Sequence, residues 1–540
     1  MYASLVRSTV ALAALCVAYP IQTQASDPAH ESHHGKLGTV HFEVACNEAA
    51  QREFNLAMAY YHSFVMEQMK APLERTLQAD GSCGMAHWAT ALASLDNPFG
   101  WPGNVSAKTL ADGAELMERA RKTGLKTQRE RDLVDALAVF FKDTEKLNHA
   151  ARAKALEAAL QDVAARYPDD SEATILYSLV LSANFNPADK QYGNQLKAAK
   201  QLEAVFAKEP DHPGVTHYLI HSYDYPPLAA HGLEAARRYS KIAPAAAHAQ
   251  HMPSHIFTRV GAWAESVASN TASANADGGK TWNSPHAYDY MVYAYLQMGQ
   301  DRAAHLVRDG ALSNPTPPDH FAAAFSYASM PARLALERGD WAAAAKLPLT
   351  PAAGAYPWAK YPQAEANNAY ARALGAAALR DAEGVSAELA RLQALRDRAT
   401  ELKLGYWVEQ IGIQTDVVRG FSAARSGDVK AGIAALQAAA AREDASEKHA
   451  VTPGPLLPAR EVLAKVLLDS GDAAGALREF EAVLSKEPNR LRGMAGAALA
   501  AERRDDAAKA RDYTGKIARQ TARADGGVDG TQLARLSVTR

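Results

Sequence analysis

The sequence predicts an all-α protein built as a solenoid of stacked helical hairpins. Alanine runs are frequent while Val and Ile are sparse, which favours helix over sheet. The chain has 540 residues, more than one compact core usually serves, so several domains or a repeat array are expected. Pro210 and Pro244, each at the end of a predicted helix pair, lie 34 residues apart, and related marks recur along the chain.

The repeat is clearest near the C-terminus, where five residues follow one another at intervals of 5, 4, 3 and 5: Gly471, Ala476, Phe480, Val483 and Pro488. Glycine permits a tight turn between two helices, and alanine lets the helices approach closely. The larger side chains fill their interface, and proline ends the second helix. This order resembles the tetratricopeptide-repeat superfamily over about residues 50–520. The resemblance implies a right-handed superhelical solenoid whose groove is lined by the first helix of every pair.

The chain also resembles exported bacterial repeat proteins that carry HYLIH and HMPSH segments, a likeness that implies fold and location but no activity. The predicted organisation is given by five ranges: a signal peptide (1–25), a mobile polar leader (26–45), an N-terminal repeat array with a histidine-lined groove (46–346), a C-terminal repeat array (347–520) and a frayed tail (521–540).

The N-terminus is typical of a secretory signal, so we expect export to the periplasm or the medium. Arg7 precedes an apolar run, residues 9–19, which is too short to span a bilayer, and Ala25 ends a small-residue cleavage site. No later segment is apolar enough to be a transmembrane helix. Signal removal leaves Cys46 and Cys83, which predict one disulfide in an oxidising compartment; two unpaired thiols are the alternative.

Charge and motifs exclude several functions. The net charge of −2 does not favour nucleic acid as a partner. The sequence contains no Gly-rich phosphate loop, no serine nucleophile elbow and no HExxH motif. The HYLIH segment matches the last motif in spacing only, because Tyr218 stands where a protease has its general base.

Seven of the chain's 18 histidines fall within residues 212–255. Two pairs, His217 with His221 and His251 with His255, have the spacing of four that places both rings on one helix face. Counting along the repeat directs both pairs into the groove from adjacent first helices. The same register adds two more rings, so the predicted metal ligands are His217, His221, His248, His251, His255 and His286.

Five further residues are predicted as supporting groups or alternative ligands: Asp224, Asp289, Arg259, Tyr293 and His62. Six imidazoles exceed one tetrahedral shell, so either some only support the ligands or two ions bind. Imidazole suits copper, zinc, iron and nickel, and a thiolate-free site in an exported protein favours copper, with zinc or iron as alternatives.

The sequence therefore predicts a metal-binding protein, or a metal-dependent enzyme acting on a small substrate, with oxidoreductase favoured over hydrolase. The alternative is a non-catalytic scaffold that holds a peptide or partner protein in the groove, since fold alone does not determine chemistry. An insertion at residues 274–290 is expected beside the histidines, as a lid or as a surface loop.

Overall fold

A computed structural model describes residues 37–103, 105–525 and 532. Every regular element in this part of the chain is a helix, so the predicted all-α solenoid is confirmed. The predicted signal peptide, the first part of the leader and most of the tail beyond Asp525 lie outside the described residues.

Twelve helices form the first part of the array: α2 (Glu48–His62), α3 (Lys70–Ala79), α4 (Met85–Ser94), α5 (Ala107–Thr123), α6 (Gln128–Phe141), α7 (His149–Arg166), α8 (Ser171–Ala183), α9 (Gly193–Phe206), α10 (Pro213–Tyr223), α11 (Leu233–Ile242), α12 (Ala247–His251) and α13 (Pro253–Arg259). The rest of the array follows: α14 (Trp263–Asp277), α15 (Asn283–Gln297), α16 (Asp301–Leu312), α17 (Phe321–Glu337), α18 (Trp341–Ala345), α19 (Pro362–Ala378), α20 (Ala382–Glu401), α21 (Gly405–Arg425), α22 (Val429–Ala445), α23 (Ala459–Asp469), α24 (Ala473–Lys486), α25 (Leu491–Glu502) and α26 (Ala507–Gln520). Short 3-10 turns occur at Met66–Met69, Pro98–Gly100, Ala229–Gly232 and Trp358–Lys360.

The helix pair α23–α24 shows how the repeat residues act. Gly471 turns the chain between the two helices with φ of +91°, a conformation that glycine adopts without steric cost. Asp472 then caps α24 by accepting a hydrogen bond from the Gly475 amide. Ala476 and Phe480 are fully buried, so the second helix packs closely on its neighbours.

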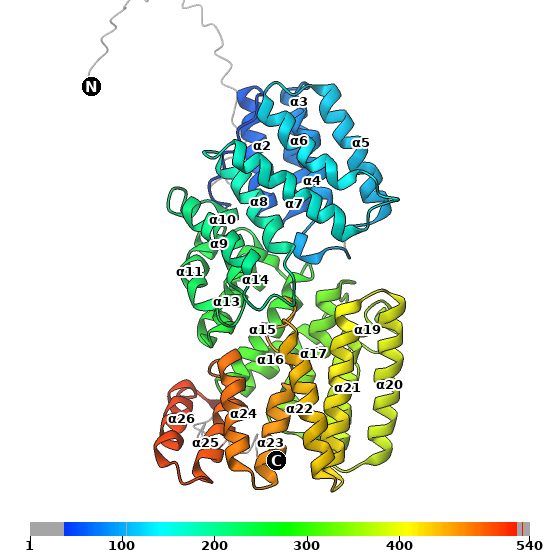
Figure 1. The fold of residues 1–540 in the computed structure, drawn as a ribbon, viewed down its shortest axis with the longest axis vertical. Coiled ribbons are helices and arrows are strands. Elements are labelled where there is room, and N and C mark those ends of the chain that lie inside the picture. Colours follow the sequence, from blue (N-terminus) through cyan, green and yellow to red (C-terminus); the bar gives the residue numbers. More distant parts are fainter. Residues whose placement is uncertain (1–36, 104, 526–531, 533–540) are drawn as a thin grey trace, which may run out of the picture.

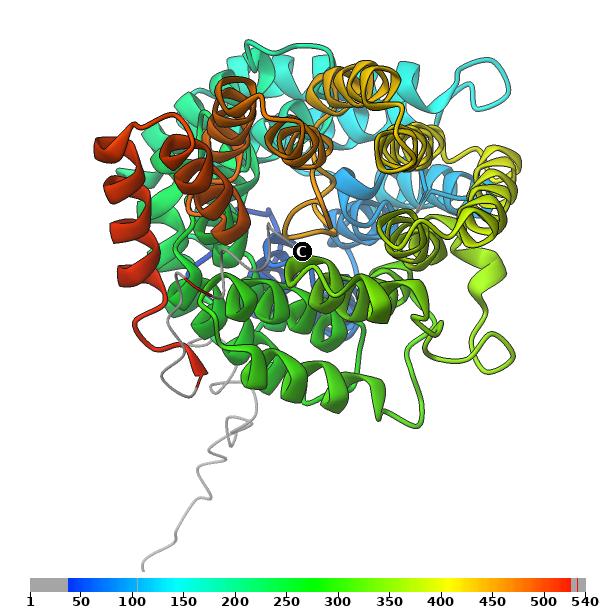
Figure 2. The same ribbon diagram turned by 90° about the horizontal axis from the view of Figure 1, so that it is seen from below.

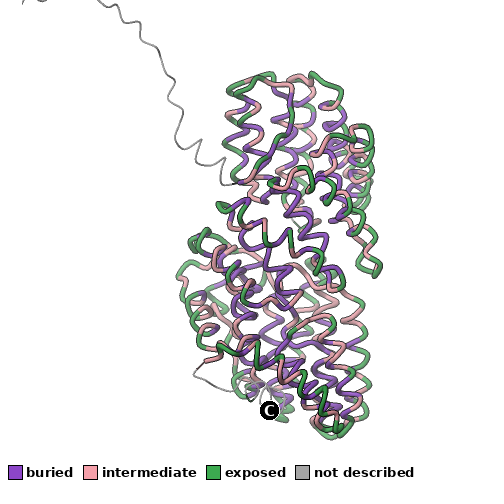
Figure 3. Tube along the Cα trace, turned by 90° about the vertical axis from the view of Figure 1, so that its left-hand side faces the viewer, coloured by how far each residue is buried: buried purple, intermediate pink, exposed green. Residues whose placement is uncertain are grey.

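Successive pairs stack side by side from α2 near the top of Figure 1 to α26 at the bottom. Seen along the stack, the helices surround a central region (Figure 2). The connection between α22 and α23, residues 446–458, extends into that region. Buried residues follow the inner faces of the helices, while the outer turns are exposed (Figure 3). None of the helices within the described ranges is long and apolar enough to cross a membrane.

The two predicted arrays are in direct contact. Both α17 and α18 pack on α19, across the predicted boundary at residue 346. The largest buried apolar clusters cover residues 37–257 and 332–517, and a smaller one draws on residues from 292 to 451. The helix contacts therefore continue across the predicted boundary, while the buried apolar residues form several clusters.

Two segments differ from expectation. Residues 37–45, predicted to be part of a mobile leader, are packed: Phe42 is fully buried with its ring beside Phe54 and Trp88. Alternating apolar residues give this segment the burial that a polar leader would lack. The insertion at residues 274–290 is mostly the end of α14 and the start of α15, with Asp277 bonding to Thr281 across the short connection.

Cys46 and Cys83 are joined by a disulfide, with a Cα–Cα distance of 5.4 Å. Cys46 precedes α2 and Cys83 precedes α4, so the bond ties together the first two helix pairs.

Candidate metal centre

The six predicted ligand histidines lie on four helices. His217 and His221 are on α10, His248 and His251 on α12, His255 on α13 and His286 on α15. The helix expected to carry both His251 and His255 is divided at Met252, because Pro253 has no amide hydrogen to continue the helical bonding. The rings of His251 and His255 nevertheless lie next to each other, with their planes at 84°.

The rings form two adjacent groups of three. In the first group, Nε2 of His217 lies 3.2 Å from Nε2 of His221 and 3.2 Å from Nε2 of His248. In the second group, Nε2 of His251 lies 3.0 Å from Nε2 of His255, and the ring of His286 is 4.4 Å from that of His251. Within each group, one potential ligand atom per ring lies within 4.8 Å of the others.

The two groups border each other. The ring centroids of His221 and His255 are 6.4 Å apart, as are those of His248 and His251. Five of the six histidines are buried, and His248 is partly exposed. The sequence alone left one or two ions open; this arrangement brings together two three-imidazole groups.

Hydrogen bonds fix the orientation of three of the rings. Nδ1–H of His217 donates to the carbonyl oxygen of His62 at 2.7 Å, and Nδ1–H of His255 donates to Asp224 at 2.9 Å. Nδ1–H of His251 donates to Oδ1 of Asn270 at 2.7 Å. The Asn270 amide nitrogen bonds to the carbonyl of Ser266, which settles that Oδ1 is the acceptor.

These bonds leave the facing nitrogens without hydrogen. Because Nδ1 of both His251 and His255 donates, each neutral ring directs a lone pair from Nε2 at the other, across 3.0 Å. A proton on one of the two nitrogens, or a metal ion between them, would relieve that repulsion. Two nitrogens bound to one tetrahedral ion at 2.0–2.1 Å are about 3.3 Å apart, close to the distances in both groups.

Electrostatics oppose a proton in that position. Burial lowers the pKa of all six rings below the usual histidine value, and neighbouring imidazoles lower it further for His217, His221, His248, His251 and His286. For His255, the bond to Asp224 opposes the effect of burial on the pKa, but Lys448 and Arg259 add to it. The rings are therefore neutral, the form that binds metal.

Aromatic side chains cover the centre. The Phe99 ring stacks on His221 with centroids 3.9 Å apart, and Phe64 packs against His217 at 4.4 Å. Tyr290 packs against His251 at 4.8 Å on the other side. Trp282, from the 274–290 insertion, lies 6.1 Å from His286. These rings exclude water and lower the local dielectric, which strengthens electrostatic interactions inside.

A third buried cluster adjoins the first group of rings, and its side chains hydrogen-bond to one another. Glu172 accepts hydrogen bonds from Nε2 of His62 at 3.0 Å and Nε2 of His212 at 3.1 Å, and Nδ1 of His62 pairs with the Tyr218 hydroxyl. Nδ1 of His212 accepts from the Gly214 amide, so all four ring nitrogens have hydrogen-bond partners, and the cluster holds in place the His62 backbone that orients His217. Gly214 makes room, because a Cβ there would be 2.5 Å from Nδ1 of His62.

The other predicted supporting residues fall in two places. Asp224 holds His255 and also pairs with Arg259 at 2.8 Å, and Nζ of Lys448 lies 3.5 Å from it. Burial opposes ionisation, but Lys448 and Arg259 hold the pKa of Asp224 well below its usual value. The structure places Asp289 and Tyr293 away from the rings: Asp289 pairs with Arg333 at 2.8 Å, and Tyr293 accepts from Arg490 at 3.0 Å.

Sequence reasoning missed several groups around the centre, namely Phe64, Phe99, Glu172, Asn270 and Lys448. They come from α8, α14 and three connections, none of which carries a mark of the site in its own sequence. Only the solenoid's curvature brings residues 64 and 99 to rings more than a hundred positions further along the chain.

No protein-family model matches this sequence, and no curated protein matches it. Solved structures give distant likenesses. One, titled "Structure of Naa15/Naa10 bound to HypK-THB", is 12% identical, covers 90% of this chain and 73% of that chain, and has a TM-score of 0.25. Another, "Crystal structure of APC/C hetero-tetramer Cut9-Hcn1", is 10% identical, covers 90% and 96%, and has a TM-score of 0.29. Scores this low carry no inference about function.

Proposed function

We propose that this protein binds two transition-metal ions side by side, each held by one group of three histidines. The observation that carries the proposal is the His251–His255 pair. Both Nδ1 atoms donate to fixed acceptors, so two lone pairs meet at 3.0 Å in a buried place where protonation is opposed. Orienting bonds of this kind on the far nitrogen are typical of metal-binding histidines.

The donor set favours copper over zinc and iron. Neutral imidazoles alone make up both groups, without thiolate or carboxylate, and imidazole is a good ligand for copper. Copper, which changes oxidation state, would supply electron-transfer chemistry to a small substrate, whereas zinc would supply Lewis-acid chemistry. Asp224, Asn270 and the carbonyl of His62 would hold the rings in either case.

Elemental analysis tests the proposal directly. Protein purified without a histidine tag, loaded with copper or zinc and dialysed, is expected to retain two ions per chain. Retention of one ion would leave a mononuclear site. A chain that retains none of copper, zinc, iron or nickel would contradict the proposal.

The competing function, a scaffold for a long peptide, requires a free groove. Residues 446–458 extend into the central region, where the backbone oxygens of Ala450 and Thr452 accept from the Tyr290 hydroxyl. Lys448 of the same connection pairs with Asp224. A long peptide would have to displace these contacts, which favours a small ligand beside the metal centre.

We also propose that the chain is exported and cleaved after Ala25. The disulfide between Cys46 and Cys83 fits an oxidising compartment. Denatured, unreduced protein from the cell envelope or medium is expected to take up no alkylating reagent, and two equivalents after reduction. A chain that keeps Cys16 would take up one equivalent before reduction, and an intact mass that includes residues 1–25 would contradict cleavage.

A further inference from the structure

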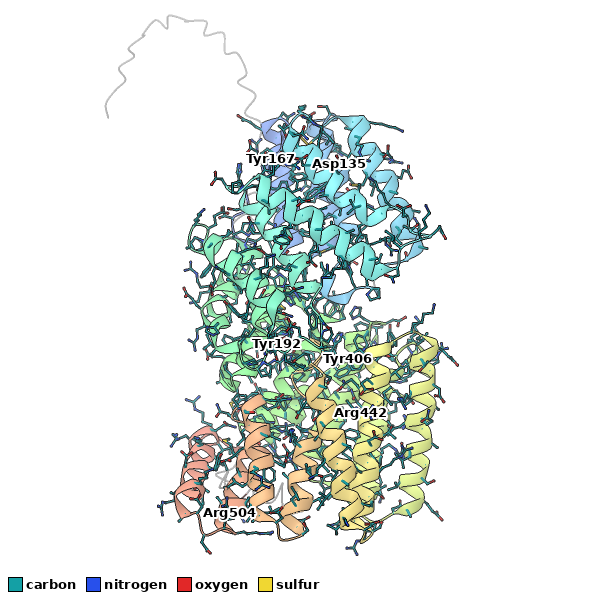
Figure 4. All side chains as sticks on the ribbon, in the orientation of Figure 1. Asp135, Tyr167, Tyr192, Tyr406, Arg442 and Arg504 are labelled. Carbon is teal, nitrogen blue, oxygen red and sulfur yellow. A yellow bond between two sulfur atoms is a disulfide. The ribbon has the colours of Figure 1, made fainter. Side chains whose placement is uncertain are left out.

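A cavity of about 440 Å³ lies beside the metal centre, between residues 446–458 and the C-terminal part of the array. Its volume is in the range of small-molecule sites. Five aromatic side chains contribute to its walls: Tyr192, Phe325, Tyr370, Tyr406 and Trp407. Tyr192 and Tyr406 lie at mid-height in Figure 4; the Tyr192 hydroxyl donates to the Glu447 carboxylate and the Tyr406 hydroxyl to the Glu447 carbonyl oxygen.

One wall of the cavity carries a cation with unused donors. The Lys448 side chain is 8% exposed, and its Nζ has no hydrogen-bond partner in the described part of the chain. The nearest anion, Asp224, is 3.5 Å away and already bonds to His255 and Arg259. An ammonium group has three donors, so Lys448 can still bind an anionic oxygen from a ligand.

Another part of the wall carries two buried carboxyl groups, Glu443 and Glu487. Glu443 accepts from the Ala459 amide at 2.8 Å, and Glu487 faces the Tyr293 hydroxyl at 3.4 Å. Among the described residues, no lysine or arginine nitrogen pairs with either carboxylate, although neighbouring Asp444 has two such partners. Burial raises the pKa of Glu443 to about 7 and also raises that of Glu487, although Arg259, Arg490, Lys448 and Arg333 act against the rise at Glu487.

We propose that this cavity binds a small zwitterion that carries an amine, a carboxylate and an apolar or aromatic side chain: a free amino acid or a dipeptide. Its carboxylate would lie at Lys448, its ammonium group at Glu443 and Glu487, and its side chain against the aromatic wall. Aromatic faces also attract an ammonium group. The proposal goes beyond metal binding and does not depend on it, because none of these three groups belongs to the six histidines.

Calorimetric titration with matched ligands tests it. L-Phenylalanine is expected to bind, whereas phenylalaninamide, which lacks the carboxylate, and N-acetylphenylalanine, which lacks the ammonium group, should each bind about tenfold more weakly or worse. The dipeptide Phe-Leu shows which class of zwitterion the cavity prefers. Tighter binding than that of phenylalanine would indicate peptides, and weaker binding would indicate free amino acids. The proposal would be overturned if phenylalaninamide and N-acetylphenylalanine both bound as tightly as phenylalanine, or if neither phenylalanine nor Phe-Leu bound.

Variants of the cavity test which residues bind the carboxylate and the ammonium group of the ligand. Lys448→Met should remove the preference for phenylalanine over its amide, and the double change Glu443→Gln/Glu487→Gln should remove the preference over the N-acetyl form. Exposed Lys346→Met and Glu383→Gln are the matched controls and should change neither. Unchanged preferences in folded variants, checked by circular dichroism, would contradict the assignment. Metal content measured on the same samples separates this result from that of the metal proposal.

Discussion

Replacing His251 and His255 together with alanine is expected to reduce the bound metal from two ions to one per chain. These two rings supply two of the three ligands of the second group and leave the first group intact. A second double variant, His221→Ala/His255→Ala, removes one ligand from each group and is expected to lose both ions. The measurement is metal per chain by elemental analysis after dialysis against a weak chelator.

The variant His305→Ala controls for the loss of a histidine outside the centre, because this residue is exposed on α16. It should retain both ions. Circular dichroism at matched temperature shows whether each variant keeps its helices. Full retention of two ions by either double variant, with normal helicity, would mean that the assigned rings do not bind the metal.

The metal-free protein is expected to lose stability steeply as pH falls below about 6.5. In the unfolded chain the histidines titrate near that pH, while burial holds the pKa of the six rings below it in the folded state. Below pH 6.5 the unfolded state therefore binds more protons than the folded state, and the free energy of unfolding decreases. Each unit of difference in pKa contributes about 1.4 kcal/mol per ring, so several rings together give a large effect.

Urea unfolding at pH 7.5, 6.5, 5.5 and 5.0 measures this dependence. The range ends above the pKa of ordinary carboxyl groups. Glu443, whose pKa is raised to about 7, gains stability over the same range, but six rings outweigh this one carboxyl group. The variant His251→Asn/His255→Asn should show a shallower decrease than the parent, because two of the six rings are gone. A free energy of unfolding that stays constant or rises between pH 6.5 and 5.0 would contradict buried neutral imidazoles.

Local spacing was enough to predict the helices and the grouping of the histidine rings. The positions of His217, His221, His251 and His255 follow from two short-range periods, 3.6 residues per turn and 34 residues per hairpin. In a solenoid each repeat contacts mainly its neighbours, so register on one helix carries over to the next. The disulfide followed from cysteine count and predicted export, because signal removal leaves only Cys46 and Cys83.

The repeat register predicts which residues face the groove, but it could not predict which side chains they contact there. Asp289 was predicted beside the rings because its register matched theirs, yet its carboxylate pairs with Arg333 from α17. A buried carboxylate forms an ion pair with a cation near it in space, and sequence spacing does not identify that cation. Tyr293 similarly meets Arg490, almost two hundred residues further along the chain.

Periodicity and residue type act locally, so they were enough to predict an all-helical repeat array, its disulfide and six imidazoles that face inward. Long-range packing divides the rings into two groups of three, lets Asn270 and Asp224 fix their orientation, and places Phe64 and Phe99 against them. The same packing brings Lys448, from residues 446–458, to Asp224. These contacts join segments far apart in the chain, and they form only where the curvature of the whole array brings the segments together.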